Sequence, residues 1–193
     1  MMGYDNRILK PSEYDAIREQ PEKYKNKFIL DLFLNTGMRY AELKRFVANV
    51  NDKNSGFKWF RPEEEMIILP KQATKTKIQR EVILTPAFTE KLKDEIERND
   101  GRLYPLPAYQ VLDENLKRWA RKAGIEMPEI IAVKTFRKTW ESWLVYANKN
   151  IFYILSSQGH SNAVALKHYV KKITKWDEKE KKEIIKRTQG WGE

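Results

Sequence analysis

The chain contains no cysteine, and among its 193 residues histidine occurs only as His160 and His168. The first absence excludes disulfide bonds and thiolate zinc sites, and the second excludes a histidine-rich metal centre. No apolar run approaches the roughly 18 residues of a membrane-spanning helix, and the N-terminus lacks the apolar region of a secretory signal. We therefore expect a cytoplasmic protein that contacts no membrane.

The charge of the chain is unbalanced, since 37 Lys and Arg residues against 27 Asp and Glu residues give a formal net charge of +10. Such a surplus favours a polyanionic partner, because basic side chains displace the counterions condensed on phosphates. A solvated basic surface would explain the same number. Hydrophobic residues at 41% and aromatic residues at 12% argue against a disordered chain. With no internal repeat and no Pro/Gly/Ser-rich linker, we expect residues 1–193 to form one domain.

Hydrophobic periodicity predicts a mostly helical α+β fold with one small antiparallel sheet. Apolar residues recur at helical spacing between Tyr24 and Asn35, and Gly37 follows as a helix stop. Two short apolar runs, 66–69 and 81–84, predict the strands of a β-ribbon within residues 57–84. Further helices are expected from Pro11, with Ser12 as a possible cap, around 43–47, from Pro86 with Thr85 as cap, and at 111–123, 136–144, 151–155, 164–169 and 177–187.

Several basic residues stand at helix edges or in the ribbon turn rather than on ordinary helix faces. Arg39 follows Thr-Gly-Met at the first turn of a helix, and Lys75 lies between the two strands. Lys134 and Arg137 are three residues apart at the start of the aromatic helix, so they share a face. Each of them alone is typical of a surface or ion-pair residue. Only their combination indicates a phosphate-binding site.

That combination, with His160 and Tyr169 following it, resembles the tyrosine recombinases, which include the phage integrases and the Xer-type recombinases. Residues 36–43, TGMRYAEL, are similar to the first arginine box of that family. Lys134 and Arg137 stand where the family usually has His-x-x-Arg, and Gly-His followed nine residues later by Tyr169 resembles the family's last two motifs. The resemblance spans about residues 10–170. The lysine variant resembles integrases of some archaeal viruses and plasmids.

The resemblance implies a helical catalytic domain that begins without the family's N-terminal core-binding domain. Its partner would be double-stranded DNA carrying an attachment site. The protein would self-associate on this DNA, as a tetramer in synapsis, and be a monomer alone. Residues 171–193 would form a C-terminal tail helix. The family counterpart of this tail docks on a neighbouring protomer, and a simple charged terminal helix is the alternative.

The chemistry that the resemblance implies is transfer of a DNA phosphodiester to Tyr169, the nucleophile, giving a 3′-phosphotyrosyl link. It requires no cofactor and no metal when protein cations neutralise the transition state. Arg39 and Arg137 would bind the two non-bridging oxygens, because a guanidinium fork matches phosphate oxygens. His160 would donate a further hydrogen bond. Lys134 would add positive charge or a hydrogen bond.

The resemblance assigns the protonation of the leaving 5′-oxygen to Lys75, which stands seven residues before Val82, as the family lysine does before its second-strand valine. Lys71 and Lys77 are alternatives for this role. Glu42 is expected to brace the first arginine box. We expect the surrounding duplex to be held by further basic side chains: Lys44, Arg45, Lys71, Lys77, Arg80, Arg118 and Arg121.

Two other functions remain open from the sequence. A type IB topoisomerase uses the same tyrosine chemistry and relaxes supercoiled DNA without needing a defined site. A non-catalytic DNA-binding or assembly module of the same fold would bind DNA without any covalent product.

Overall fold

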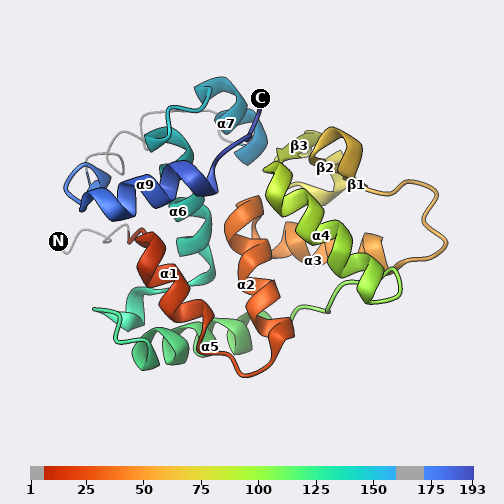
Figure 1. The fold of residues 1–193 in the computed structure, drawn as a ribbon. Helices are drawn as coiled ribbons and strands as arrows, with labels where there is room; N and C mark the ends of the chain where they lie inside the picture. Colours follow the sequence, from red (N-terminus) through yellow and green to blue (C-terminus); the bar gives the residue numbers. More distant parts are fainter. Residues whose placement is uncertain (1–6, 160–171) are drawn as a thin grey trace.

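Helices make up most of the chain in the computed structural model, which describes residues 7–159 and 172–193 (Figure 1). The fold class that the sequence predicts is thereby confirmed. The helices are α1 (Pro11–Arg18), α2 (Tyr24–Thr36), α3 (Tyr40–Asn51), α4 (Pro86–Arg98), α5 (Tyr109–Lys122), α6 (Val133–Tyr146), α7 (Ile151–Gln158) and α9 (Glu178–Arg187), with 3-10 turns η1 (Pro62–Glu64), η2 (Lys71–Ala73) and η3 (Pro128–Ile130).

Three short antiparallel strands form the sheet in the order β1 (Phe60–Arg61), β2 (Met66–Leu69) and β3 (Arg80–Ile83). Ile67 pairs with Val82, and both side chains are fully buried. Leu69 pairs with Arg80 and is also buried, so the strands alternate between an inner and an outer face. The predicted ribbon within residues 57–84 is confirmed, and β3 begins one residue earlier than the sequence indicated.

Helices α2 and α6 lie in the middle of the molecule (Figure 1). Every residue of α2 from Phe28 to Leu34 is buried, including Asp31. Helix α6 buries Phe136, Trp140 and Trp143 completely. In Figure 1, α1, α5 and α9 surround this centre on one side, and α3, α4 and the sheet lie on the other. The predicted aromatic helix therefore forms part of the core that supports both sides.

Capping at the helix ends largely follows the sequence. The backbone of Gly37 ends α2 in the left-handed conformation, with φ +58°, and Thr85 Oγ1 accepts from the Phe88 amide at 3.2 Å to cap α4. The prediction for Ser12 was wrong. Lys10 is the N-cap of α1, and the hydroxyl of Ser12, the second residue of the helix, donates to Glu180 instead. Because Pro11 takes the first helical position, the cap lies two residues before the serine that the sequence suggested.

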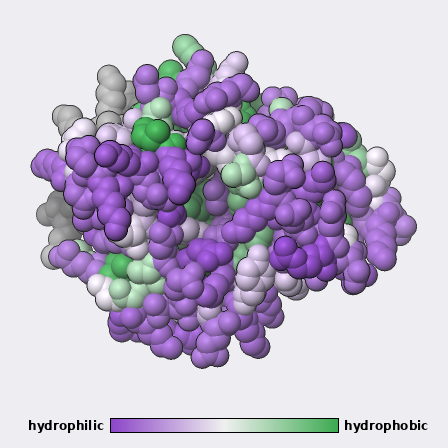
Figure 2. Space-filling view, viewed as in Figure 1, coloured by the Kyte–Doolittle hydropathy of each residue, from purple (hydrophilic) through white to green (hydrophobic). Residues whose placement is uncertain are grey.

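The C-terminal residues pack against their own chain. Asp177 Oδ1 caps α9 by accepting from the Glu180 amide at 2.9 Å. Ile184 on α9 is fully buried, and Trp191 beyond it donates from Nε1 to the Ile83 carbonyl of β3 at 2.9 Å. Figure 2 shows that hydrophilic residues cover most of the visible face, in keeping with the charged outer side of α9. The described tail is therefore an integral part of this fold.

Within the described ranges, no helix is both long and apolar enough to cross a membrane.

Candidate active site

The first arginine box forms the junction between α2 and α3. Gly37 turns the chain, and Arg39 is the N-cap of α3 with its side chain about one-third exposed. The carboxylate of Glu42, one turn further on, accepts from the Arg39 amide at 2.9 Å and from Arg39 Nη1 at 2.9 Å. Glu42 thus fixes both the backbone and the side chain of Arg39. This contact agrees with the bracing role expected for Glu42.

Glu42 is itself buried and holds a second guanidinium, that of Arg80, whose Nη2 donates to Glu42 Oε2 at 2.6 Å. Burial alone would raise the pKa of Glu42. The charge of Arg80 and the hydrogen bonds from Arg39 outweigh it, so the pKa lies below its usual value. Glu42 is therefore a carboxylate at neutral pH, and its negative charge is shared between two arginines.

Arg137 projects from α6 into the same region, with its side chain 10% exposed. Its Nη1 donates to the Gly37 carbonyl at 2.9 Å, its Nη2 donates to the Gln158 carbonyl, and its Nε lies 3.0 Å from Glu141. Burial lowers the pKa of Arg137 to about 10, with Glu141 acting in the opposite direction. The guanidinium stays charged at neutral pH and is joined directly to the turn before Arg39.

A surface pocket of about 690 Å³ lies in front of this junction, between the start of α3, η2 and the loop that leads to β3. Its lining includes five cationic side chains and the single carboxylate of Glu42: Arg39, Arg45, Lys71, Lys75 and Lys77 are the cations. We call this the cationic pocket. All three candidate lysines for the general acid line it, so the geometry does not separate Lys75 from its two alternatives.

Hydrogen bonds fix the start of the loop that carries Lys75 and Lys77. Thr74 is buried, and its hydroxyl lies 2.8 Å from the Ile78 carbonyl across the loop. Arg45 Nη1 donates to the Ala73 carbonyl at 2.8 Å. These bonds hold the start of the loop against α3, while Lys75 and Lys77 themselves are exposed. The arrangement suits side chains that reach outward to a polyanion.

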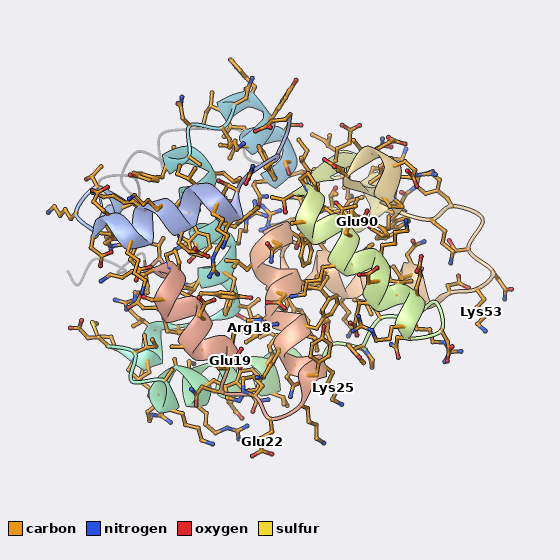
Figure 3. All side chains as sticks on the ribbon, viewed as in Figure 1. Arg18, Glu19, Glu22, Lys25, Lys53 and Glu90 are labelled. Carbon is orange, nitrogen blue, oxygen red and sulfur yellow. The ribbon has the colours of Figure 1, made fainter. Side chains whose placement is uncertain are left out.

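A second pocket, of about 800 Å³, lies between α1, α2, α4 and the C-terminal residues, and Figure 3 labels Arg18 and Glu19 on its wall. Its lining carries charges of both signs. The buried carboxylate of Asp31 is matched there by Arg18, at 2.6 Å, and Lys91, at 2.7 Å. Burial would raise the pKa of Asp31, but these cations hold it below its usual value. Within residues 7–159 and 172–193, none of the residues predicted for DNA chemistry lines this second pocket.

The structure places Arg80 differently from the sequence prediction, which assigned it to the DNA surface. Its side chain is only 6% exposed and is bound to Glu42 and to the Gln158 carbonyl. The reason is the alternation along β3, because Arg80 shares the inner face with Val82 while Glu81 points outward. The sequence signal for this burial is the alternation of side chains along a strand: Arg80 stands two positions before the apolar Val82 and therefore points to the same face.

The other predicted DNA contacts lie on the surface but not together. Lys44 is exposed on α3, beside the cationic pocket residue Arg45. Arg118 and Arg121 are exposed on α5, where they bind Asn115 and Glu129. In Figure 1, α5 lies at the opposite end of the view from the sheet. Neither of these two arginines lines the cationic pocket.

Lys134 is exposed near the start of α6 and does not line the cationic pocket. His160 and Tyr169, as well as the helix expected at 164–169, lie outside the described residues. Gln158 and Glu141 have no predicted functional role in the sequence pattern. Both are buried, and both bind Arg137.

The family model of the phage integrases matches residues 6–175, and this stretch contains all of the site residues described above. The chain belongs to the phage integrase family. Comparison with the sequences of curated proteins gave no significant match.

Solved structures agree with this family in their fold. XerA recombinase superposes with a TM-score of 0.60 at 15% identity, over 95% of this chain and 63% of that one. The integrase of transposon Tn1549, bound to a circular intermediate DNA, gives a TM-score of 0.64 at 18% identity, over 85% and 61%. The same integrase bound to transposon right end DNA gives 0.63 at 17%, again over 85% and 61%. This phage integrase family member spans a little over 60% of their lengths.

Proposed function

We propose that this protein cleaves and rejoins DNA at a specific site, by metal-independent transfer of a phosphodiester to Tyr169. The observation that carries the proposal is the cationic pocket itself. In a chain of the phage integrase family, it brings Arg39 and the candidate lysines to one surface, directly in front of the junction held by Arg137. A phosphate at this surface meets fixed positive charge, and fixed charge stabilises a transition state without reorganisation.

In the proposed reaction, the scissile phosphate binds at the side of the cationic pocket that faces the junction. Its non-bridging oxygens interact with Arg39 from the pocket lining and with Arg137 from the junction behind that lining. The Tyr169 oxygen forms a bond to phosphorus while the bond from phosphorus to the 5′-oxygen breaks. Lys75 gives its proton to that leaving oxygen. Tyr169 would attack as the phenolate after giving its proton to solvent. Positive charge of the cationic pocket near the phosphate would favour this form of a side chain whose free pKa is about 10. Attack by a 5′-hydroxyl of another strand reverses the step and rejoins the DNA.

The charges of the junction fit a single phosphodiester. Arg39, Arg80 and Arg137 supply three positive charges, and Glu42 and Glu141 supply two negative ones. The cluster therefore carries one net positive charge before the lysines of the pocket are counted. A phosphodiester bound in the cationic pocket, with one negative charge, is attracted both by this net charge and by the lysines of the pocket.

The test is formation of a covalent adduct on a nicked suicide substrate that carries the attachment site. Wild-type protein should give a denaturation-resistant protein–DNA product, and Tyr169→Phe should give none. Tyr153→Phe is the matched control, because Tyr153 is half exposed on α7 and is not placed in the site. An adduct formed by Tyr169→Phe would remove the nucleophile assignment. Salt-sensitive binding without any adduct would identify a DNA-binding module, and site-independent relaxation of plasmid DNA would identify a topoisomerase.

For the assembly, residues 1–193 act as one catalytic domain that is monomeric alone and forms a tetramer on attachment-site DNA in synapsis. The family membership and the DNA-bound integrase structures support a DNA partner for this domain. Mass measurement in solution, with and without attachment-site DNA, tests this stoichiometry. The lysine at position 134, in place of the usual histidine, supports an origin in an integrating virus or plasmid of archaea.

A further inference from the structure

We infer that Arg80 is a positioning residue for strand cleavage, which holds the Arg39–Glu42 pair and the end of α7 in one fixed arrangement. The inference rests on the proposed function, because it assigns a role to Arg80 within that reaction. Arg80 does not line the cationic pocket, so it acts through the residues that do.

The hydrogen bonds of Arg80 connect separate elements. From β3, Arg80 Nη2 donates to Glu42 on α3 at 2.6 Å, and Nη1 donates to the Gln158 carbonyl at the end of α7 at 2.7 Å. Glu42 in turn holds Arg39, and the Gln158 carbonyl also accepts from Arg137. Arg39 and Arg137 are therefore linked through one continuous set of bonds, with Arg80 in the middle.

The packing around Arg80 is close enough to require glycine beside it. Gly159 ends α7 with φ +64°, and a Cβ at this position would lie 2.9 Å from Arg80 Nη1. The residue that follows Gly159 is His160. Arg80 therefore fixes the backbone at the point where the chain continues to the predicted histidine, while Glu42 fixes the predicted arginine.

The two turns of the site also contact each other directly. Gln158 Nε2 donates to the Thr36 carbonyl at 3.3 Å, and a Cβ on Gly37 would lie 2.3 Å from Gln158 Oε1. A shift of the α7 end would therefore move the turn before Arg39. Arg80 donates hydrogen bonds both to α3 and to the end of α7, so it holds this contact from a third element, β3.

A contribution to the stability of the fold is a poor explanation for a buried arginine at position 80. Burial, opposed by Glu42, lowers the pKa of Arg80 below its usual value, and among the described residues its Nε has no hydrogen-bond partner. Replacing a buried ion pair by apolar side chains of similar volume is often neutral or stabilising. A buried arginine with an unmatched donor is instead suited to a role that depends on geometry.

The experiment compares Arg80→Met, which keeps the length of the side chain, with Arg80→Lys, which keeps its charge, in the full 193-residue chain. The matched control is Arg18→Met, since Arg18 also pairs with a buried carboxylate, that of Asp31, but lies on the second pocket. For each protein we would measure the melting temperature, the Kd for attachment-site DNA, and the single-turnover rate of adduct formation at saturating DNA, at a temperature where every variant is folded.

A positioning role predicts that Arg80→Met slows adduct formation by about 100-fold, the order expected when a reacting group is misplaced by about 1 Å. Its Kd for DNA should stay within about twofold of the wild-type value, and Arg80→Lys should recover part of the rate. Arg18→Met should melt at a lower temperature but react at the wild-type rate. In a double-mutant cycle, Arg80→Met and Glu42→Gln should be non-additive in rate, because the two side chains act through one bond.

Two results would overturn the inference while leaving the proposed function intact. One is an Arg80→Met protein that melts at a lower temperature yet forms the adduct at the wild-type rate, which would make the role structural. The other is a weaker Kd for DNA with an unchanged rate, which would make Arg80 a DNA contact. A wild-type chain that forms no adduct would overturn the proposed function, and the inference with it.

Discussion

At the scale of the residue, buried charge distinguishes this site from the surrounding surface. Glu42, Glu141 and the guanidinium groups of Arg80 and Arg137 are almost completely removed from water. Each charge is compensated by an opposite charge or by a backbone carbonyl at hydrogen-bond distance. Such groups keep one geometry, because leaving any of them unpaired in the interior is costly.

The lowered pKa of Glu42 predicts a loss of stability in acid. Because the pKa is lower in the folded chain than the value of about 4.3 in an unfolded one, Glu42 contributes stability above pH 4.3 that disappears as pH falls through the folded value. In denaturant titrations between about pH 7 and pH 3, Glu42→Gln should lose less free energy of unfolding than the wild type on acidification.

Asp31 provides the comparison for this experiment, because its pKa is also lowered and its carboxylate is also buried, but it faces the second pocket. Asp31→Asn should flatten the same acid dependence without slowing adduct formation. An acid slope in Glu42→Gln identical to that of the wild type would contradict the ionised state assigned to Glu42.

At the scale of the element, the decisive feature is the turn between α2 and α3. The sequence predicts its position, because Gly37 interrupts a helical pattern and the arginine box follows. The sequence does not predict that the side chain of Gln158, more than a hundred positions later, packs against this glycine. Local pattern locates helices and strands, whereas the partner of a buried polar group depends on how the elements pack.

Variants of three glycines separate the two constraints on Gly37, which are its positive φ and its close contact with Gln158. Gly37→Ala combines a positive φ with a Cβ 2.3 Å from Gln158 Oε1, Gly124→Ala has a positive φ of +69° in open space, and Gly56→Ala has neither constraint. We expect a loss in free energy of unfolding of about 1 kcal/mol for Gly124→Ala, a larger loss for Gly37→Ala, and little change for Gly56→Ala. Chemical denaturation measures all three. Equal losses at 37 and 124 would contradict the close contact with Gln158.

The same limit explains which site residues could be predicted. Arg39, Glu42 and the pocket lysines follow from the motif and the ribbon, and the structure brings them together. Arg80 was assigned to the surface because a positive charge in a basic ribbon is usually solvated. Its burial follows from the strand period and from Glu42, a carboxylate that reaches it from another element. Sequence pattern alone gives no such long-range pairing.

At the scale of the whole molecule, the C-terminal helix α9 packs against the rest of the chain. Two neighbouring isoleucines on α9 test how much this packing contributes to stability. Ile184 is fully buried, whereas Ile185 is 51% exposed. Ile184→Ala should lower the free energy of unfolding by about 2–5 kcal/mol, and Ile185→Ala should change it by less than about 0.5 kcal/mol. Thermal or urea denaturation distinguishes the two. Similar small effects from both variants would mean that α9 does not pack on its own chain.

The net charge of +10 predicts that DNA binding depends strongly on salt. The logarithm of the association constant should fall linearly with the logarithm of salt concentration, with a slope of about −0.9 for each phosphate neutralised. Lys77→Gln, in the cationic pocket, should make this slope shallower by about 0.9 if Lys77 contacts a phosphate. Glu90→Gln on the exposed face of α4 serves as the control, and Figure 3 labels this residue. Fluorescence anisotropy at several salt concentrations gives the slopes, and identical slopes for Lys77→Gln and the wild type would remove Lys77 from the interface.

The acceptor shared by Arg80 and Arg137 belongs to the main chain, as the carbonyl of Gln158. Any amino acid at position 158 supplies that oxygen, so replacing the glutamine cannot delete the acceptor. In a complete mutational scan, sensitivity at position 158 would report the side-chain contacts with Thr36 and Gly37 instead. The role of this carbonyl, which accepts hydrogen bonds from two arginines, would therefore not be detected by substitutions at position 158. It would be detected only as intolerance of substitution at positions 80 and 137.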